Sequence, residues 1–128
     1  MRLLLDTHIF LWYVQDDSRL APAWAGALRN TQNEVFLSVV SFWEIIIKSQ
    51  IGKLPLPAAP EIYVPNMRDQ HQFSSLSVDE FDVAYVAQLP SIHNDPFDRL
   101  LIAQALRHCL TFLTVDTKIQ AYPNLSLL

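Results

Sequence analysis

The chain has 128 residues, of which 51% are hydrophobic and 17% charged, which excludes a disordered chain and favours one domain, residues 1–128, with a hydrophobic core. The only cysteine excludes an internal disulfide and fits a reducing cytoplasm, and no apolar run approaches the ~18 residues of a membrane span or forms a signal peptide. The formal net charge of −4 argues at first against a nucleic-acid partner.

The predicted elements alternate between strands and helices. In chain order they are a strand at residues 2–6, a helix from 9–12 onward, a helix at 19–31, a strand at 34–37, a helix at 39–50, a weak strand at 73–76, a helix opening at 77–80, a helix at 95–108, a strand at 111–115, a short helix at 117–122 and a strand at 125–128. This alternation indicates a mostly parallel sheet with helices on both faces, so we expect a three-layer α/β/α sandwich. Ligands bind to such sheets in the crevice at the carboxyl ends of the strands.

Capping residues and prolines set several of the expected helix ends. Ser38 is a good N-cap for the helix at 39–50, which is apolar nearly all round and is therefore expected to be buried. Ser77 and Glu80 have the spacing of a capping box. Four prolines within residues 55–65 predict a surface loop with a broken or short helix.

Four carboxylates lie next to apolar segments, namely Asp6, Glu44, Asp98 and Asp116. A buried carboxylate is costly unless hydrogen bonds or an opposite charge compensate it. Two of the four, Asp6 and Asp116, stand at the carboxyl ends of predicted strands. Without the four, nine acidic residues (13 − 4 = 9) face nine basic ones, so the negative charge is concentrated in one candidate site. Bound cations would reverse its local sign.

Each of these acids also has a structural explanation. Asp6 and Asp116 could cap the helices that follow them, and for Asp6 capping and metal binding are equally supported. Glu44 could pair with Lys48 four residues later. Because Glu44 lies well inside an apolar helix, a functional role is favoured for it.

Two acids compete for the third position of the site. Asp95, followed by Pro96, is a good N-cap for the helix that begins there. Asp98 shares a helical stripe with Leu101 and Ile102, which places it on the side facing the core. We therefore expect Asp98 to be the ligand and Asp95 to be the cap or a neighbour of the ligands.

The donor set indicates the metal. Carboxylates without a Cys/His cluster suit Mg²⁺ or Mn²⁺ rather than zinc, and such cations are suited to phosphodiester hydrolysis. The histidines are scattered, at positions 8, 71, 93 and 108, and solvent-facing or hydrogen-bonded histidines fit better than a metal-free acid–base pair. His93, beside the acidic helix start, is the candidate for a contact with substrate or ligands. The three tryptophans are expected in the core: Trp12, Trp24 and Trp43.

Four sequence blocks resemble the PIN domain, most closely the VapC-type toxins of bacterial toxin–antitoxin pairs: Leu3–Thr7, Leu37–Ile45, His93–Ala105 and Leu113–Asp116. The resemblance covers essentially the whole chain. It implies a Mg²⁺- or Mn²⁺-dependent endoribonuclease, usually dimeric, that a small antitoxin inhibits. It also assigns the acidic quartet as Asp6, Glu44, Asp98 and Asp116, with Thr7 and Thr114 ordering it.

One position departs from the family pattern. Many members have the third acid three residues before an Ile-Ala pair, whereas here Arg99 holds that position and Asp98 precedes it. Asp95 therefore stays open as an alternative ligand, alone or together with Asp98.

The expected function is hydrolysis of an RNA phosphodiester, with Asp6, Glu44 and Asp98 holding a metal and Asp116 completing the site or holding a second ion. A phospho-acceptor receiver domain fits less well, because Asp6 is followed by Thr7 and residues 73–78 contain no acid. The intact quartet argues against an inactive PIN binding module. Apolar residues around Trp12, Trp43 and Ile45 could line a groove for an antitoxin segment or belong to the core.

Overall fold

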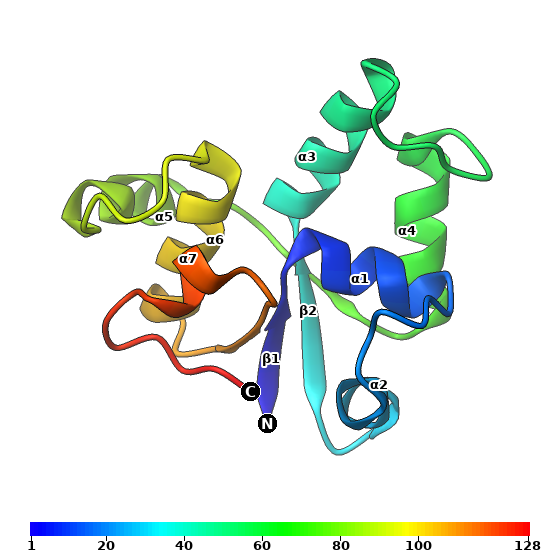
Figure 1. Cartoon of the computed structure of the whole chain (residues 1–128), viewed down its shortest axis with the longest axis horizontal. Coiled ribbons are helices and arrows are strands. Elements are labelled where there is room, and N and C mark those ends of the chain that lie inside the picture. Colours follow the sequence, from blue (N-terminus) through cyan, green and yellow to red (C-terminus); the bar gives the residue numbers. More distant parts are fainter.

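A computed structural model describes all 128 residues and has a central parallel sheet with helices on both faces (Figure 1). The elements are β1 (Arg2–Leu5), α1 (Thr7–Val14), α2 (Pro22–Arg29), β2 (Glu34–Ser38), α3 (Val39–Gln50), α4 (Pro60–Gln70), β3 (Ser74–Leu76), α5 (Glu80–Tyr85), the 3-10 helix η1 (Val86–Gln88), α6 (Pro96–Arg107), β4 (Thr111–Leu113) and α7 (Thr117–Gln120). The strands lie in the order β3-β2-β1-β4, and every neighbouring pair is parallel. The three-layer α/β/α sandwich predicted from the sequence is confirmed.

Strand β1 is buried on both of its faces. Leu3, Leu4 and Leu5 are each 0% exposed. Because successive side chains of a strand point to opposite faces, Leu3 and Leu5 pack with residues of α1, α2 and α4, and Leu4 packs with residues of α6 and α7. Figure 1 shows these two groups of helices on opposite sides of the sheet. A continuous apolar run is what a strand of a fully covered parallel sheet requires.

The strand order reverses at β1. The chain places β2 and β3 on one side of β1 and then returns to add β4 on the other side. The backbone N–H of Asp6 donates to the carbonyl of Leu113 at 3.0 Å, which joins the carboxyl ends of β1 and β4. In open α/β sheets this reversal point is where ligands bind.

Residues 55–59 form the loop expected within 55–65, but helix α4 contradicts the expected break at the prolines. Pro60 occupies the first helical turn, where its missing N–H leaves no bond unmade. Pro65 lies inside the helix, and its neighbour Val64 is 0% exposed in the hydrophobic core. Tertiary packing therefore maintains a helix of 11 residues across a proline that was expected to break it.

Two other boundaries also differ from the sequence prediction. Asp79, rather than Ser77, caps α5, because its carboxylate accepts from the backbone N–H of Asp82 at 2.8 Å and the Asp82 carboxylate accepts from the Asp79 N–H at 3.2 Å. The strand expected at 125–128 is reduced to a single bridge between Leu127 and Phe112.

Helix α3 is not buried all round, which corrects the expectation drawn from its apolar sequence. Val39 and Trp43 are 41% and 55% exposed, so Trp43 is not a core residue. The Trp43 ring packs edge-on against Phe97 of α6, with centroids 4.9 Å apart. The polar Glu44 lies on the buried side of the same helix. None of the helices reaches the length and apolar character that crossing a membrane requires.

Candidate active site

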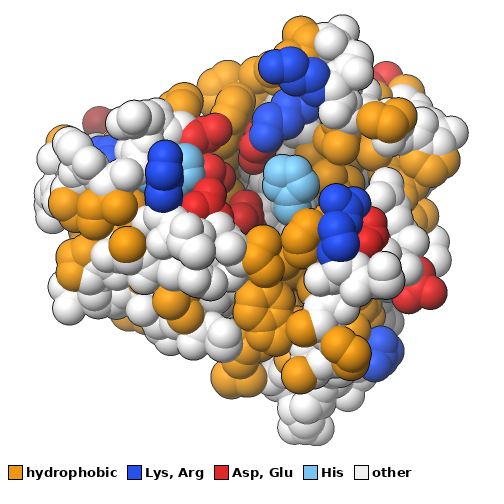
Figure 2. Space-filling view, in the orientation of Figure 1, with side chains coloured by type: hydrophobic (Ala, Val, Ile, Leu, Met, Phe, Trp, Pro, Cys, Tyr) orange, Lys and Arg blue, Asp and Glu red, His pale blue; other side chains and the backbone are white.

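A cavity of about 380 Å³ at the carboxyl edge of the sheet is lined by five acids: Asp6, Glu44, Asp95, Asp98 and Asp116. Four elements supply them, because these acids lie at the end of β1, within α3, at the start of α6 and at the start of α7. Figure 2 shows acidic side chains gathered in the hollow of this face, with Lys and Arg side chains around them. The structure thus brings the expected quartet together, and Asp95 with it.

Asp6 caps α1 and also lines the cavity, so its two interpretations do not exclude each other. Its Oδ1 accepts from the Thr7 backbone N–H at 2.7 Å, and its Oδ2 accepts from the Thr114 hydroxyl at 2.7 Å. The residue is only 7% exposed. Burial raises the pKa of Asp6 above its usual value, although these two hydrogen bonds oppose the rise.

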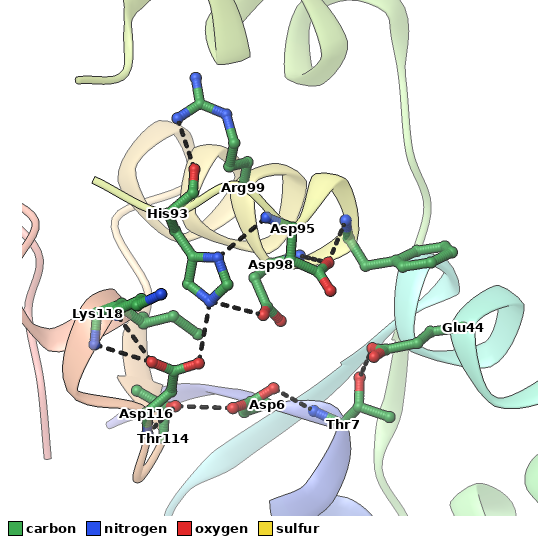
Figure 3. Close-up of polar contacts among 12 residues, drawn as sticks. Asp6, Thr7, Glu44, His93, Asp95, Asp98, Arg99, Thr114, Asp116 and Lys118 are labelled. Atoms are coloured by element: carbon green, nitrogen blue, oxygen red, sulfur yellow. Dashed lines mark hydrogen bonds and ion pairs between the residues drawn. The ribbon is translucent and has the colours of Figure 1, made fainter. Parts of the chain in front are cut away.

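Glu44 is 3% exposed and is held from two sides. The Thr7 hydroxyl donates to Oε1 at 2.6 Å, and the Lys48 ammonium forms an ion pair with Oε2. Burial acts to lower the pKa of Lys48, but the hydrogen bond to Glu44 and the negative charge around it outweigh burial and raise it. Thr7 therefore links Asp6, through its N–H, to Glu44, through its hydroxyl (Figure 3).

His93 bridges two of the acids. Its Nε2 lies 3.0 Å from a carboxylate oxygen of Asp98 and 3.0 Å from one of Asp116 (Figure 3). Its Nδ1 accepts from the Asp95 backbone N–H at 3.0 Å. Because Nδ1 accepts, this hydrogen bond assigns the proton of the neutral ring to Nε2, which donates to Asp116 and lies equally close to Asp98. His93 is placed to hold Asp98 and Asp116 rather than to offer a free nitrogen to a metal.

Asp95 and Asp98 occupy the positions expected from helix geometry. Asp95 Oδ1 accepts from the backbone N–H groups of Phe97 at 2.8 Å and Asp98 at 3.1 Å, which makes Asp95 the N-cap of α6. The Asp98 carboxylate points at His93 and the cavity (Figure 3). Asp95 lines the same cavity, so its other oxygen is also available there.

Arg99 lies on α6, and its side chain binds the segment in front of that helix rather than lining the cavity. Its guanidinium donates to the carbonyls of Val86, at 3.2 Å, and Pro90, at 2.9 Å, and to the hydroxyl of Tyr122 at 3.1 Å. The one-residue departure from the family pattern therefore leaves Asp98, not Arg99, beside the other acids.

The pKa values of Asp98 and Asp116 show how unevenly the negative charge is compensated. Burial, together with the charges of Asp6, Asp95, Glu44 and Asp116, raises the pKa of Asp98 to about 8. Burial also acts to raise the pKa of Asp116, but hydrogen bonds from His93 and from the backbone of Lys118 and Ile119 lower it. Hard oxygen donors in need of positive charge fit a hard divalent cation such as Mg²⁺ or Mn²⁺.

The cavity is also lined by residues that the sequence did not assign to the metal site, namely His8, Trp12, Arg19, Lys48 and Val115. Trp12 was expected in the core and Arg19 carried no local signal, since it lies in the connection between α1 and α2. Of the residues that could either line a groove or belong to the core, only Ile45 is a core residue. Ile45 is 0% exposed in the core, whereas Trp43 does not line the cavity that Trp12 lines.

The family model of the PIN domain matches residues 3–125. Ribonuclease VapC16 of Mycobacterium tuberculosis is 38% identical over 58 residues, a match that covers 45% of this chain and 41% of that relative. Ribonuclease VapC22 of the same organism is 25% identical over 121 residues, which covers 94% of this chain and 91% of that relative. The match to VapC16 thus spans less than half of that protein, and the match to VapC22 spans nearly all of it.

Solved structures share the fold at low sequence identity. VapBC2 from Rickettsia felis, bound to a promoter DNA fragment, superposes with a TM-score of 0.74 at 16% identity, covering 100% of this chain and 98% of that chain. DNA-bound VapBC from Salmonella typhimurium gives a TM-score of 0.70 at 15% identity, with 100% and 97% coverage.

Proposed function

The chain belongs to the PIN domain family, and we propose that it is a metal-dependent endoribonuclease, the toxin of a toxin–antitoxin pair. The observation that carries the proposal is the cavity lined by five carboxylates, in which the pKa of Asp98 rises to about 8. Two relatives named as ribonucleases support the RNA substrate. The family match also leaves no role for the receiver-domain alternative.

Asp6, Glu44, Asp98 and Asp116 would hold Mg²⁺ or Mn²⁺, with Asp95 as the alternative or additional ligand. When bound, the cation supplies the positive charge that activates water and stabilises the leaving oxygen of a phosphodiester. The carboxylates by themselves repel an anionic RNA backbone, so substrate binding depends on their neutralisation.

Thr7, Thr114 and His93 keep the carboxylates in place. Thr114 holds Asp6 and Thr7 holds both Asp6 and Glu44, while the Nε2–H of His93 holds Asp98 and Asp116. Donors of this kind orient ligands and limit the entropy lost when a cation or substrate binds.

The partners belong to the same proposal. The neighbouring structures are VapBC complexes, so we expect a small antitoxin protein to bind and inhibit this chain. We also expect a cytoplasmic homodimer, alone or within a larger toxin–antitoxin complex. A small DNA-binding protein in the adjacent gene, and the mass of the purified complex by light scattering, would test these expectations.

The Asp6→Asn variant tests the catalytic proposal. Asn keeps an acceptor for the Thr7 N–H but removes the negative charge, so Mn²⁺-dependent cleavage of an RNA pool should fall by at least about 100-fold. The melting temperature should not fall. Asp69→Asn, an exposed acid outside the cavity, is the matched control and should keep full activity. Full activity of Asp6→Asn, or of the unmodified protein in EDTA, would overturn the mechanism, whereas an absence of Mn²⁺-dependent cleavage by the unmodified protein would favour an inactive module.

A further inference from the structure

We propose that Arg19, held over the Trp12 ring by Asp17, is a stacking platform for one base of single-stranded RNA at the mouth of the acidic cavity. This inference rests on the proposed ribonuclease function and names the groups that position the RNA beside the phosphodiester that is cut.

The platform shares a cavity with the acids. Trp12 and Arg19 line the same cavity of about 380 Å³ as Asp6, Glu44 and Asp98. Trp12 lies on α1, the helix that Asp6 caps, so its distance from the acids is fixed by one rigid element. A nucleotide next to the one whose phosphate meets the acids therefore faces this wall.

The arrangement of the guanidinium is that of a preformed planar surface. Its central carbon lies 5.0 Å from the centroid of the Trp12 ring. Asp17 fixes its plane with two hydrogen bonds, from Nη2 at 2.7 Å and from Nε at 3.1 Å. The Arg19 side chain is nevertheless 66% exposed, so much of it remains accessible to a ligand. Bases of single-stranded RNA stack on such guanidinium planes.

Stacking, rather than attraction of a phosphate, is the interaction that the surroundings favour. Asp17 compensates the charge of Arg19, which weakens long-range attraction for the RNA backbone but leaves the planar face unchanged. His8 is exposed and also lines the cavity, with its ring centroid 6.3 Å from that of Trp12 and its plane tilted by 53°.

Arg2 provides a matched control within the same chain. Its guanidinium lies 5.5 Å from the centroid of Phe36 and 3.6 Å from a carboxylate oxygen of Glu34, and its side chain is 54% exposed. Arg2 is at the amino end of β1, away from the acidic cavity. Arg19→Lys and Arg2→Lys therefore make the same chemical change at two similar stacks, of which one faces the cavity.

The experiment measures both RNA cleavage and RNA binding. In the otherwise unmodified protein, Arg19→Lys should raise KM for a single-stranded oligonucleotide on the order of tenfold, because lysine keeps the charge but offers no plane. Arg2→Lys should leave KM unchanged. In the Asp6→Asn background, fluorescence anisotropy should show the same loss of affinity for the labelled oligonucleotide.

Oligonucleotides with one abasic position identify the stacked base. In the Asp6→Asn background, removal of one base beside the cleavage site should weaken binding, and Arg19→Lys should cause no further loss with that oligonucleotide. Equal affinities of the Arg19→Lys and Arg2→Lys proteins, or additive losses at every abasic position, would overturn the platform. If the unmodified protein cleaves no RNA yet binding still depends on Arg19, the proposed function fails and the platform stands.

Discussion

Asp82 on α5 and Asp98 on α6 are both carboxylates with little solvent exposure, but the protein surrounds them differently. Asp82 is 0% exposed and receives Nη1 of Arg107, Nε2 of His108 at 3.0 Å and the Gln104 amide at 3.2 Å. Asp98, with a side chain 14% exposed, has only the Nε2 of His93 beside it at 3.0 Å, and that group forms its hydrogen bond with Asp116.

The pKa values follow this difference. Burial acts to raise the pKa of Asp82, but the Asp79 backbone and the side chains of Arg107, Gln104 and His108 outweigh it, and the pKa falls below its usual value. At Asp98, burial and the negative charges of the neighbouring acids act in the same direction, and together they raise its pKa to about 8. Burial of a carboxylate is therefore not what marks a functional site. What marks it is burial that the protein's own cations leave uncompensated.

Substituting Asn for Asp98 should produce the largest effect, in opposite directions for activity and stability. Loss of a ligand charge should reduce metal-dependent RNA cleavage by more than about 100-fold. Removal of a carboxylate whose pKa is raised should stabilise the metal-free protein at pH 7 by about 1–3 kcal/mol. Urea unfolding in EDTA measures the second effect. A loss of stability would mean that neighbouring groups compensate the negative charge of Asp98 as fully as they compensate that of Asp82.

Removal of the His93 bridge should have the next largest effect. His93→Ala should reduce cleavage at limiting Mn²⁺ by about 10- to 100-fold, because Asp98 and Asp116 lose the donor that holds them. His93→Gln, whose amide can donate to one carboxylate, should recover part of the loss. His108→Ala removes a histidine that contacts Asp82 instead, and should leave the Mn²⁺ dependence unchanged. Equal Mn²⁺ requirements for all three variants would contradict the bridging role.

Asp82→Asn should act on stability alone. It leaves Arg107 and His108 without their buried carboxylate, at a cost of about 2 kcal/mol after allowance for the partial exposure of both partners. Cleavage per folded molecule should not change. Urea unfolding at pH 7 with a parallel cleavage assay measures both, and a large loss of activity at full stability would place Asp82 in the active site.

The sequence was sufficient for the sheet and for the acids that stand at its edge. Apolar runs at Leu3–Leu5 and Phe112–Leu113 identify buried strands, and Asp6 and Asp116 follow them closely in the chain. The Asp95-Pro96 pair similarly identified the start of α6, because its capping depends on residues that are adjacent in sequence. Signals of this kind are local, so a single chain reveals them.

The remaining features depend on contacts between distant residues. Asp82 was missed because its partners Gln104, Arg107 and His108 lie more than 20 residues away. Arg19 was missed because its stacking partner Trp12 lies on α1, and the path of the chain between them cannot be read from the sequence. Trp43 was misplaced because an apolar helix sequence does not reveal which of its faces lacks a neighbour.

A pH dependence of stability separates the two kinds of carboxylate. The folded pKa of Asp98 lies above its unfolded value, so its contribution is fully present below about pH 4 and is lost as the pH rises toward 8. The metal-free protein should therefore lose stability over this range, by at most about 1 kcal/mol per pH unit. The folded pKa of Asp82 is lowered, so its contribution is lost only as the pH falls below the usual range. In urea unfolding, Asp98→Asn should flatten the dependence of stability on pH between pH 4 and 8, and Asp82→Asn should leave this dependence intact.

Saturating Mn²⁺ should reverse the dependence of stability on pH, because the cation binds ionised carboxylates and protons compete with it. An unchanged slope in Asp98→Asn would assign the titration to another group in the cavity.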